Sequence, residues 1–471
     1  MAQSPKKVIW WIRRDMRLID NPVLTNDIDR PLLVRPVFVI DPTLIGKYSA
    51  HNIRLEFMFN SLRSLNADIE NKGGRIDIHY GNPHEIIPVI YSEFGASEVR
   101  AQYDPSQVSR IRDTKIGKLV PLKLTSGLSV VGASDVRSQS DKAYKIFTPF
   151  YKSWWNKAIY NSSKLPKING EIQFTNFGDP SILNKFLSNS NKQFPASEIE
   201  AQTRLNSFLS LTKSPTLGMV KYKSNKDRLD KIGTSQLSPY LRFGLISPRL
   251  VVNKAFDVLT RNPEFTSEVS TWISELAWRD FYIAKASNMH EFEDVNFTEY
   301  FPWRLDFEQY QSWCFGKTGY PIIDAIMRQL RIEGWISNRA RMLAASFLTK
   351  QLLINWRWGA NWFMQHLIDG DSFANDGGWK WIAGVGAGAA PFFRIFNPIV
   401  QAKKYDPNGE YVRRWVPELS GLPSPYVHEP WLLTNGQRLD NKMNGYPLPI
   451  VDLHEARDRA LTTYKKLRAT T

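Results

Sequence analysis

The sequence predicts an N-terminal α/β domain built on a doubly wound parallel sheet, followed by an all-α C-terminal domain, with a long connector between them. Apolar runs alternate with amphipathic segments over residues 1–135, which is typical of a parallel sheet with crossover helices. Apolar residues recur at helical spacing across much of residues 201–471. Regular periodicity fades over residues 136–200. These three ranges are the predicted domains and connector.

The N-terminal range alternates strands and helices in order. We expect strands at residues 8–12, 35–40, 75–80, 98–102 and 119–124, and helices at residues 51–65, 85–94 and 106–118. Doubly wound sheets bind ligands at the carboxyl ends of their strands. Arg13 and Arg14 end the first strand, so they form either a pocket wall or a surface turn with solvated side chains. A glycine-rich dinucleotide motif does not follow this strand, which disfavours a dehydrogenase.

The connector is rich in proline, asparagine, serine and glycine, and only residues 144–150 are aromatic enough to pack. We expect it to lie across the surface of both domains. Beyond it, Ile322, Ile326 and Leu330 fall on one helical face. We expect helices over most of residues 201–400, with loops at Gly233, at 316–320 and at 384–388.

Composition limits the function classes. The 471-residue chain carries a formal charge of +15, which favours an anionic partner such as nucleic acid, although a solubility role is the alternative. The single cysteine, Cys314, excludes an internal disulfide and a multi-thiolate metal site, and we expect it to be a buried apolar residue. Without a signal peptide or a long apolar run, we expect a soluble intracellular protein that uses no membrane and no metal.

The stretch from residue 369 to residue 398 combines acids, an amide, aromatics and flexible backbone. Its chemistry-bearing side chains are Asp369, Asp371, Asn375, Trp379, Trp381 and Arg394. Few ordinary cores need this mixture, so the stretch predicts a cofactor pocket that opens onto a ligand. Arg339 and Arg341, slightly upstream, are candidates for the countercharge.

Two further segments have binding chemistry. Residues 233–239 place hydroxyl side chains after a glycine at a predicted helix start, which is typical of a phosphate site, although a plain capping loop is commoner. Glu275, Trp278 and Arg279 fall on one helical face, where an indole could stack on a base. The alternative is a half-buried tryptophan beside a salt bridge.

Taken together, these segments resemble the photolyase/cryptochrome family, and most closely its class I-type enzymes for cyclobutane pyrimidine dimers. The resemblance extends over nearly the whole chain. It is carried by WWIRRD at residues 10–15, YKIFTP at 144–149, GTSQLSPYLRFG at 233–244, ELAWRDFY at 275–282, TGYPIIDAIMRQL at 318–330, and DGD with ANDGGWKW between residues 369 and 381. The resemblance implies an N-terminal antenna domain and a helical domain that holds FAD.

The resemblance also assigns residues to the cofactor. The FAD-binding positions are Tyr222, Thr234, Ser235, Gln236, Leu237, Ser238, Trp272, Arg279, Asn338, Arg341, Asp369, Asp371 and Asn375. In this scheme Arg341 pairs with Asp369, and Asn375 lies opposite flavin N5. An amide at that position favours the reduced flavin that repair uses. The family relay of tryptophans matches Trp379, Trp356 and Trp313, which would carry electrons from the surface to the excited flavin.

The lesion-binding residues are assigned in the same way. The resemblance gives Trp278 and Trp381 as aromatic walls for the flipped dimer, Glu275 as a hydrogen-bonding carboxyl, Arg339 and Arg394 as phosphate contacts, and Met342 as a further lesion contact. Asn375, Glu275 and Met342 are then the catalytic residues. Enzymes for (6-4) photoproducts carry two histidines where this chain has Asn338 and Met342, so the sequence favours cyclobutane dimers.

We therefore expect light-driven repair of pyrimidine dimers in DNA by a monomer without an obligate protein partner. The alternatives are a DASH-type cryptochrome confined to single-stranded DNA, which Ser337 favours, and a blue-light photoreceptor. Ser109 and Arg110 do not match the Asn-Glu pair of folate antennae, so a folate, a deazaflavin, a flavin or no antenna all remain open. Such an enzyme would be cytoplasmic in a prokaryote and nuclear or organellar in a eukaryote.

Overall fold

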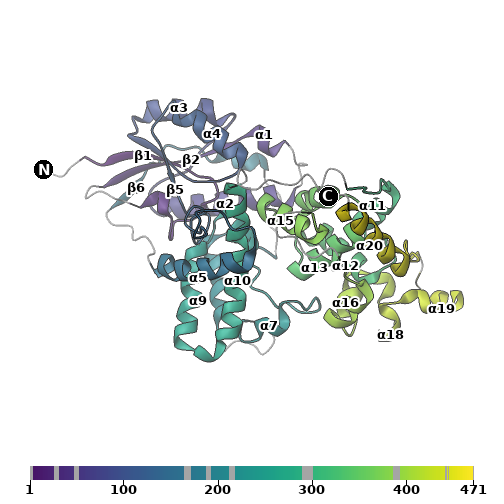
Figure 1. Cartoon of the computed structure of the whole chain (residues 1–471). Helices are drawn as coiled ribbons and strands as arrows, with labels where there is room; N and C mark the ends of the chain where they lie inside the picture. The colour runs from purple at the N-terminus through teal and green to yellow at the C-terminus, as the bar shows by residue number, and fades with distance from the viewer. Residues whose placement is uncertain are drawn as a thin grey trace. The chain divides into compact units, whose positions relative to one another are not determined.

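The computed structural model divides the chain into two compact units (Figure 1). Unit 1 contains Met1–Thr212 and Ser235–Glu291, and unit 2 contains Lys213–Thr234 and Phe292–Thr471. The structure describes residues 4–25, 31–46, 52–163, 171–186, 193–211, 218–288, 301–385, 393–440, 443 and 445–469. Within these ranges, no helix combines the length and the apolar character that crossing a membrane requires.

Unit 1 begins with a parallel sheet. Its strands are β1 (Lys6–Trp11), β2 (Leu32–Ile40), β3 (Asp77–Tyr80), β4 (Glu98–Gln102) and β5 (Leu122–Thr125), in the order β3-β2-β1-β4-β5. Every pair in this path is parallel, and the chain runs outward from β1 in both directions. The strand order therefore confirms the doubly wound α/β prediction.

Helices cover both faces of this sheet. The crossover helices are α2 (Ile53–Glu70), α3 (Pro83–Phe94) and α4 (Gln107–Gly117). Figure 1 shows α3 and α4 on one side of the sheet and α2 on the other. Ile9 and Trp11 of β1 pack with Ile87 and Ile90 of α3 and Ile116 of α4 in one buried cluster. Because strand side chains alternate between faces, Val8 and Trp10 lie buried on the opposite face.

The prediction of an irregular connector is wrong in two places. Residues Phe147–Ser163 form the 17-residue helix α5, and Ile172–Phe174 form strand β6, which pairs in parallel with the first three residues of β2. The α5 residues Phe150, Trp154, Ala158 and Ser162 are buried at four-residue spacing. The helical period was therefore present, but large aromatics, a proline and polar residues between these positions obscured it.

A second helical layer completes unit 1. It contains α6 (Glu198–Leu209), α8 (Ser238–Phe243), α9 (Pro248–Arg261) and α10 (Thr266–Ser287). Helices α5, α9 and α10 pack against one another. A buried carboxylate joins them to the loop after β5, because Asp280 Oδ2 accepts from the backbone of Val130 at 2.9 Å and Val131 at 3.1 Å and from Trp154 Nε1 at 2.9 Å.

Unit 2 is helical in its described part. Its larger helices are α11 (Phe307–Cys314), α12 (Pro321–Glu333), α13 (Asn338–Ser346), α14 (Trp356–His366), α15 (Ser372–Ala383), α16 (Pro398–Tyr405), α17 (Glu410–Trp415), α19 (Asn435–Asp440) and α20 (Leu453–Ala469). Ile322, Ile326 and Leu330 are buried in one core, as their spacing predicts. Cys314 is buried as well, and burial raises the pKa of its thiol to about 12.

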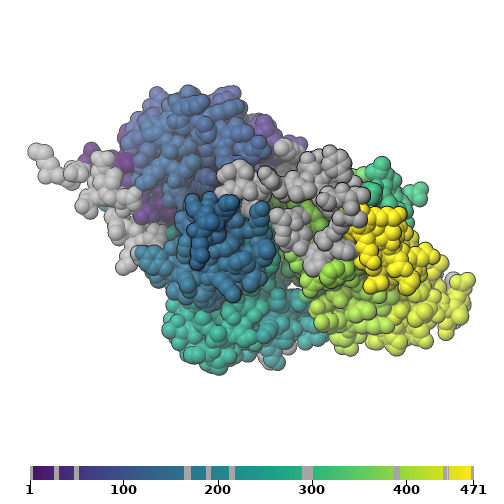
Figure 2. Space-filling model, viewed as in Figure 1, coloured from purple at the N-terminus to yellow at the C-terminus, as the bar shows by residue number. Residues whose placement is uncertain are grey.

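The C-terminal helix is tied to the core of unit 2. A π-helical turn at Phe347–Gln351 follows α13, and its buried Lys350 donates to the carbonyl of Ala383 at 3.0 Å. Tyr464 of α20 donates to the same carbonyl. Figure 2 shows the C-terminal segment in yellow on the surface of this unit. The expected loops at Gly233 and 316–320 are present, whereas residues 386–388 lie outside the described ranges.

Asp280 gives the fold a testable pH dependence. Burial raises the pKa of this carboxyl from 3.8 to about 6, so the folded state binds the proton more tightly than the unfolded state does. Stability from this group is present at low pH and is lost as pH rises through 6. We therefore expect the free energy of unfolding of wild type, measured with urea relative to that of Asp280→Asn, to be larger at pH 5 than at pH 7.5. A pH-independent difference between the two proteins would contradict this.

Candidate functional site

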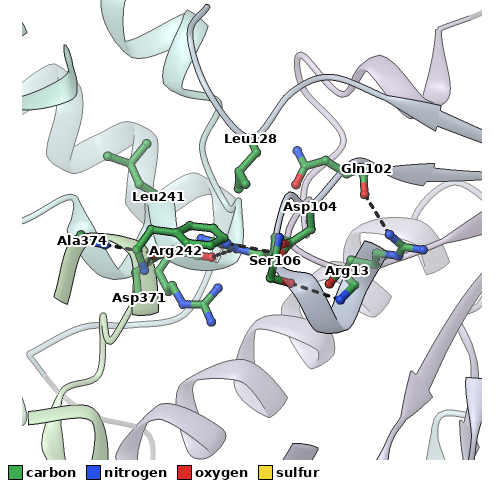
Figure 3. Close-up of polar contacts among 12 residues, drawn as sticks. Arg13, Gln102, Asp104, Ser106, Leu128, Leu241, Arg242, Asp371 and Ala374 are labelled. Carbon is green, nitrogen blue, oxygen red and sulfur yellow. Dashed lines mark hydrogen bonds and ion pairs between the residues drawn. The ribbon is translucent and has the colours of Figure 1, made fainter. Parts of the chain in front are cut away.

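The end of β1 does not carry solvated arginines. Arg13 makes a bidentate ion pair with Asp113 at 2.7 and 2.8 Å and lies 3.8 Å from the Trp11 ring centroid. Figure 3 shows Arg13 beside the backbone carbonyl of Gln102, which it approaches to 3.1 Å. Burial lowers the pKa of Arg13 to about 10. The surface-turn interpretation is therefore wrong, since these contacts make Arg13 an internal anchor between β1, β4 and α4.

The hydroxyl segment at residues 233–238 is not a plain capping loop. The N-cap position of α8 is Leu237, which has no side-chain oxygen and makes no capping hydrogen bond. Gly233 has no room for a side chain, since a Cβ there would lie 2.1 Å from the backbone oxygen of Asn225. Gln236 adopts a left-handed φ of 51°, which costs energy for a residue with a Cβ. The segment is thus fixed in an irregular conformation by its surroundings.

The hydroxyl groups of this segment lie partly at the surface. Thr234 and Ser235 are half-buried, and Ser238 is exposed at the first position of α8. Thr234 belongs to unit 2, together with the buried Tyr222, whereas Ser235 and the residues after it belong to unit 1. The predicted cofactor segment therefore crosses from one unit to the other.

Helix α10 presents the predicted lesion residues in unit 1. Glu275, Trp278 and Arg279 are half-buried, and Trp272 is buried against Phe208. Arg279 donates to the backbone carbonyls of Leu128 and Leu241, and its guanidinium lies 3.8 Å from the carboxylate of the neighbouring Asp280. The ring of Trp278 stacks on Phe147, a residue that the sequence alone does not mark as part of a site.

Helix α13 presents the first group of predicted residues in unit 2. Arg341 makes two hydrogen bonds to the Asp369 carboxylate, at 2.7 and 3.0 Å, so the ion pair expected from the sequence is present. The Asp369 side chain is only 2% exposed, and Arg341 also donates to the carbonyl of Ile336. Asn338 donates to the sulfur of Met342 at 3.8 Å, so these two side chains lie together on one face.

Helix α15 carries the second group. Asp371 caps it by accepting from the backbone of Phe373 at 3.0 Å and Ala374 at 3.4 Å, and Figure 3 shows Asp371 with Ala374. Asn375 is half-buried and donates to the carbonyl of Ala360 at 3.1 Å. This hydrogen bond fixes the orientation of the amide. Helices α13 and α15 also pack against each other, which brings the two groups together.

The predicted arginine contacts differ in their surroundings. Arg339 donates to Asp227 at 2.9 Å and lies 4.7 Å from the Tyr405 ring, with 16% of its side chain exposed. Arg394 lies 5.8 Å from the half-buried ring of Trp381. Arg339 must therefore exchange or share its carboxylate partner in order to contact a phosphate.

The three predicted relay tryptophans are all buried. Trp379 and Trp313 have ring centroids 6.1 Å apart, and Phe363 contacts both rings, at 5.0 and 6.0 Å. The exposed fractions are 3% for Trp379, 4% for Trp356 and 0% for Trp313. Trp313 is therefore enclosed in the core and does not present its indole at the protein surface.

Trp303 is a better candidate for the surface end, and sequence reasoning missed it. It is half-buried, and the next residue, Arg304, donates from its backbone to Leu353 at 2.8 Å and pairs with Ile354. Trp303 therefore lies beside the segment that leads into Trp356. Sixteen tryptophans occur in the chain, and only their exposure in the fold distinguishes a surface indole from a buried one.

Comparisons with known proteins decide the family. A family model described as "DNA photolyase" matches residues 8–168, and one described as "FAD binding domain of DNA photolyase" matches residues 272–466. The deoxyribodipyrimidine photo-lyase of Vibrio cholerae is 33% identical over 97% of this chain and 98% of its own length. The chain belongs to the DNA photolyase family.

Solved structures agree with this assignment and confirm the fold class. A bacterial class III photolyase from Agrobacterium tumefaciens matches with a TM-score of 0.87 and 31% identity, covering 100% of this chain and 99% of its own. A cryptochrome from Synechocystis matches with a TM-score of 0.83 and 27% identity, covering 98% of this chain and 100% of its own. Likeness to a class III enzyme does not assign the class I type that the sequence favours.

The residues present fit FAD. Gly233 provides a position where any side chain would collide with backbone, and the α8 N-terminus next to it has no side-chain cap. Half-buried hydroxyls on this segment suit the phosphates, because hydroxyl donors are well matched to anionic oxygens. In unit 2, Arg341, Asp371 and Asn375 supply donors and acceptors of the kind that a polar heteroaromatic ring and a sugar alcohol require.

Proposed function

We propose that this chain is a deoxyribodipyrimidine photo-lyase of class I type, which uses blue light and FAD to repair cyclobutane pyrimidine dimers in DNA. The observation that supports this most strongly is the end-to-end likeness to relatives of that name, including the Vibrio cholerae and Escherichia coli enzymes. The formal charge of +15 fits a DNA substrate, and this substrate places the enzyme in a compartment that holds DNA. The chain acts as a monomer without an obligate protein partner.

In this proposal the residues that hold the cofactor are Tyr222, Thr234, Ser235, Gln236, Leu237, Ser238, Trp272, Arg279, Asn338, Arg341, Asp369, Asp371 and Asn375. When bound, FAD supplies light absorption and a donated electron. The neutral amide of Asn375 favours the reduced, anionic form, because a carboxylate at the same position would repel its negative charge. A second, antenna chromophore of folate, deazaflavin or flavin type is compatible with this arrangement.

The chain's own residues hold the lesion outside the duplex. Photolyases belong to the enzymes that extrude their target nucleotides, at a cost of a few kcal/mol that is lower for damaged bases. The aromatic walls Trp278 and Trp381 offset this cost, since stacking contributes about 1–3 kcal/mol per base. Glu275 accepts hydrogen bonds from the base edges, and Met342 contacts the dimer. Arg339 and Arg394 bind the flanking phosphates.

The same residues favour cyclobutane dimers over (6-4) photoproducts. Cyclobutane repair requires an electron to be lent and returned, whereas (6-4) repair also requires a proton donor. Helix α13 offers Asn338 and Met342 at the positions in question, and neither side chain is an acid. Without a proton donor at these two positions, α13 suits repair of cyclobutane dimers and not of (6-4) photoproducts.

The likeness to the Synechocystis cryptochrome makes a cryptochrome function the second candidate. Two forms of it are distinguishable by experiment. A DASH-type protein would repair dimers in single strands and fail on duplexes. A photoreceptor would change its affinity for a partner in light and would repair dimers neither in single strands nor in duplexes.

A repair assay tests the proposed function. Purified, reduced protein under blue light should restore an oligonucleotide with one cyclobutane dimer, in duplex and in single strand, and should leave a (6-4) photoproduct unchanged. Damaged-DNA binding should weaken steeply between 50 and 200 mM salt, because phosphate contacts release counterions. Absence of cyclobutane repair in both substrates would contradict the proposal, and repair restricted to single strands would favour the DASH-type alternative.

The tryptophan relay gives a second test. We propose that electrons pass inward through Trp356 and Trp379, with Trp303 as the surface end and the buried Trp313 as an inner neighbour of Trp379. Trp379→Phe and Trp303→Phe should each slow flavin photoreduction by an external thiol at least tenfold, while chemically reduced variants repair normally. Trp313→Phe should slow photoreduction less than Trp303→Phe does. The reverse order would show that the surface end lies near Trp313.

A further inference from the structure

The indole of Trp278 is held by aromatic rings on several sides within unit 1. The Phe147 ring lies parallel to it, with centroids 3.7 Å apart and an interplanar angle of 7°. Phe281 meets it at 82° with centroids 5.7 Å apart, and Tyr282 lies at the same distance with a tilt of 31°. The indole plane is therefore fixed by contacts from both α5 and α10.

Phe147 is itself held firmly. It is the first residue of α5, two positions before Pro149, and α5 packs directly against α10. Its ring stacks on Tyr151 one turn later, with centroids 5.5 Å apart and an angle of 19°. Phe281 contacts its edge at 76° and 5.8 Å. Phe147 is half-buried, so its position depends on these ring contacts more than on enclosure in a core.

The parallel stack of Phe147 on Trp278 limits which face of the indole a base can use. Since Phe147 covers one face of the Trp278 ring, a base can stack only on the opposite face. An indole that is already fixed loses little side-chain freedom when a base binds, whereas a mobile indole must be ordered at that moment. Phe147 thus affects both where a base can stack and how much conformational entropy is lost when it does.

We propose that Phe147 is a positioning residue that sets the discrimination between damaged and intact DNA by pre-orienting Trp278. This inference rests on the proposed function, because it takes Trp278 as one wall of the lesion site. Phe147 does not need to touch the DNA or the flavin in order to act. Its effect is specific to the bound lesion, because only an extruded base uses the indole face.

Phe150 provides a matched control on the same helix. It lies one turn from Phe147, is 1% exposed and contacts the same Phe281 ring, at 5.2 Å and 60°. Within the described part of the chain, Phe150 makes ring contacts with Tyr144 and Phe281 and none with Trp278. Substitution at Phe150 therefore disturbs the packing between α5 and α10 without removing the stack.

The experiment measures dark binding of FAD-loaded protein to a dimer-containing duplex and to the same undamaged duplex. Phe147→Leu should lower the ratio of the two affinities about three- to tenfold, with FAD content and undamaged-DNA affinity unchanged, because one rotamer-rich side chain must be ordered on binding. Phe147→Tyr should restore the ratio, since its ring can still stack. Phe150→Leu should lower the unfolding temperature and leave the ratio at the wild-type value.

The outcomes separate this inference from the proposed function. Wild-type protein without any preference for damaged DNA would overturn the proposed function and this inference with it. A wild-type preference that Trp278→Ala removes and Phe147→Leu leaves unchanged would overturn the inference alone. Equal loss in Phe147→Leu and Phe150→Leu would also overturn it, because general packing would then explain the effect.

Discussion

The ion pair between Arg341 and Asp369 is the constraint on which the candidate site in unit 2 depends. Asp369 is almost fully buried, and a buried carboxylate is stabilised when a cation or hydrogen-bond donors pair with it. Arg341 Nη2 donates to both carboxylate oxygens of Asp369, which ties α13 to the segment that leads into α15. Asn338 and Met342 lie on the first helix, and Asn375, Trp379 and Trp381 on the second. This ion pair and the packing of α13 against α15 therefore set the relative positions of residues assigned to cofactor, relay and lesion.

Unit 1 uses the same physical principle with a different buried acid. Asp280 accepts hydrogen bonds from two backbone amides after β5 and from the indole of Trp154 on α5. The carboxylate thereby holds α10 to α5 and to the loop. Trp278 and Phe147, whose rings stack, lie on the two helices that it joins. Losing an acceptor for buried donors costs about 1–3 kcal/mol for each unpaired group, so Asp280 stabilises this junction.

Some of this architecture could be predicted from the sequence, and some could not. Strand and helix alternation before residue 135 is a local signal, and the Arg341–Asp369 pair follows from a family resemblance with specific motifs. Helix α5 was missed because its buried positions are separated by bulky aromatics that mask the period. Strand β6 is three residues long and is formed through its pairing with β2, which lies far away in the sequence. The sequence does not show that the indole of Trp313 is fully buried, because burial is a property of the fold and not of the motif.

The most direct test of this account is the FAD content of purified protein after gel filtration, measured from its visible absorption, in wild type, Asp369→Asn and Glu418→Gln. Glu418 makes a bidentate pair with Arg328 elsewhere in unit 2, so it controls for the loss of an ion pair as such. We expect wild type and Glu418→Gln to retain stoichiometric FAD and Asp369→Asn to lose most of it. Full retention of FAD by Asp369→Asn would contradict the claim that this ion pair organises the cofactor site.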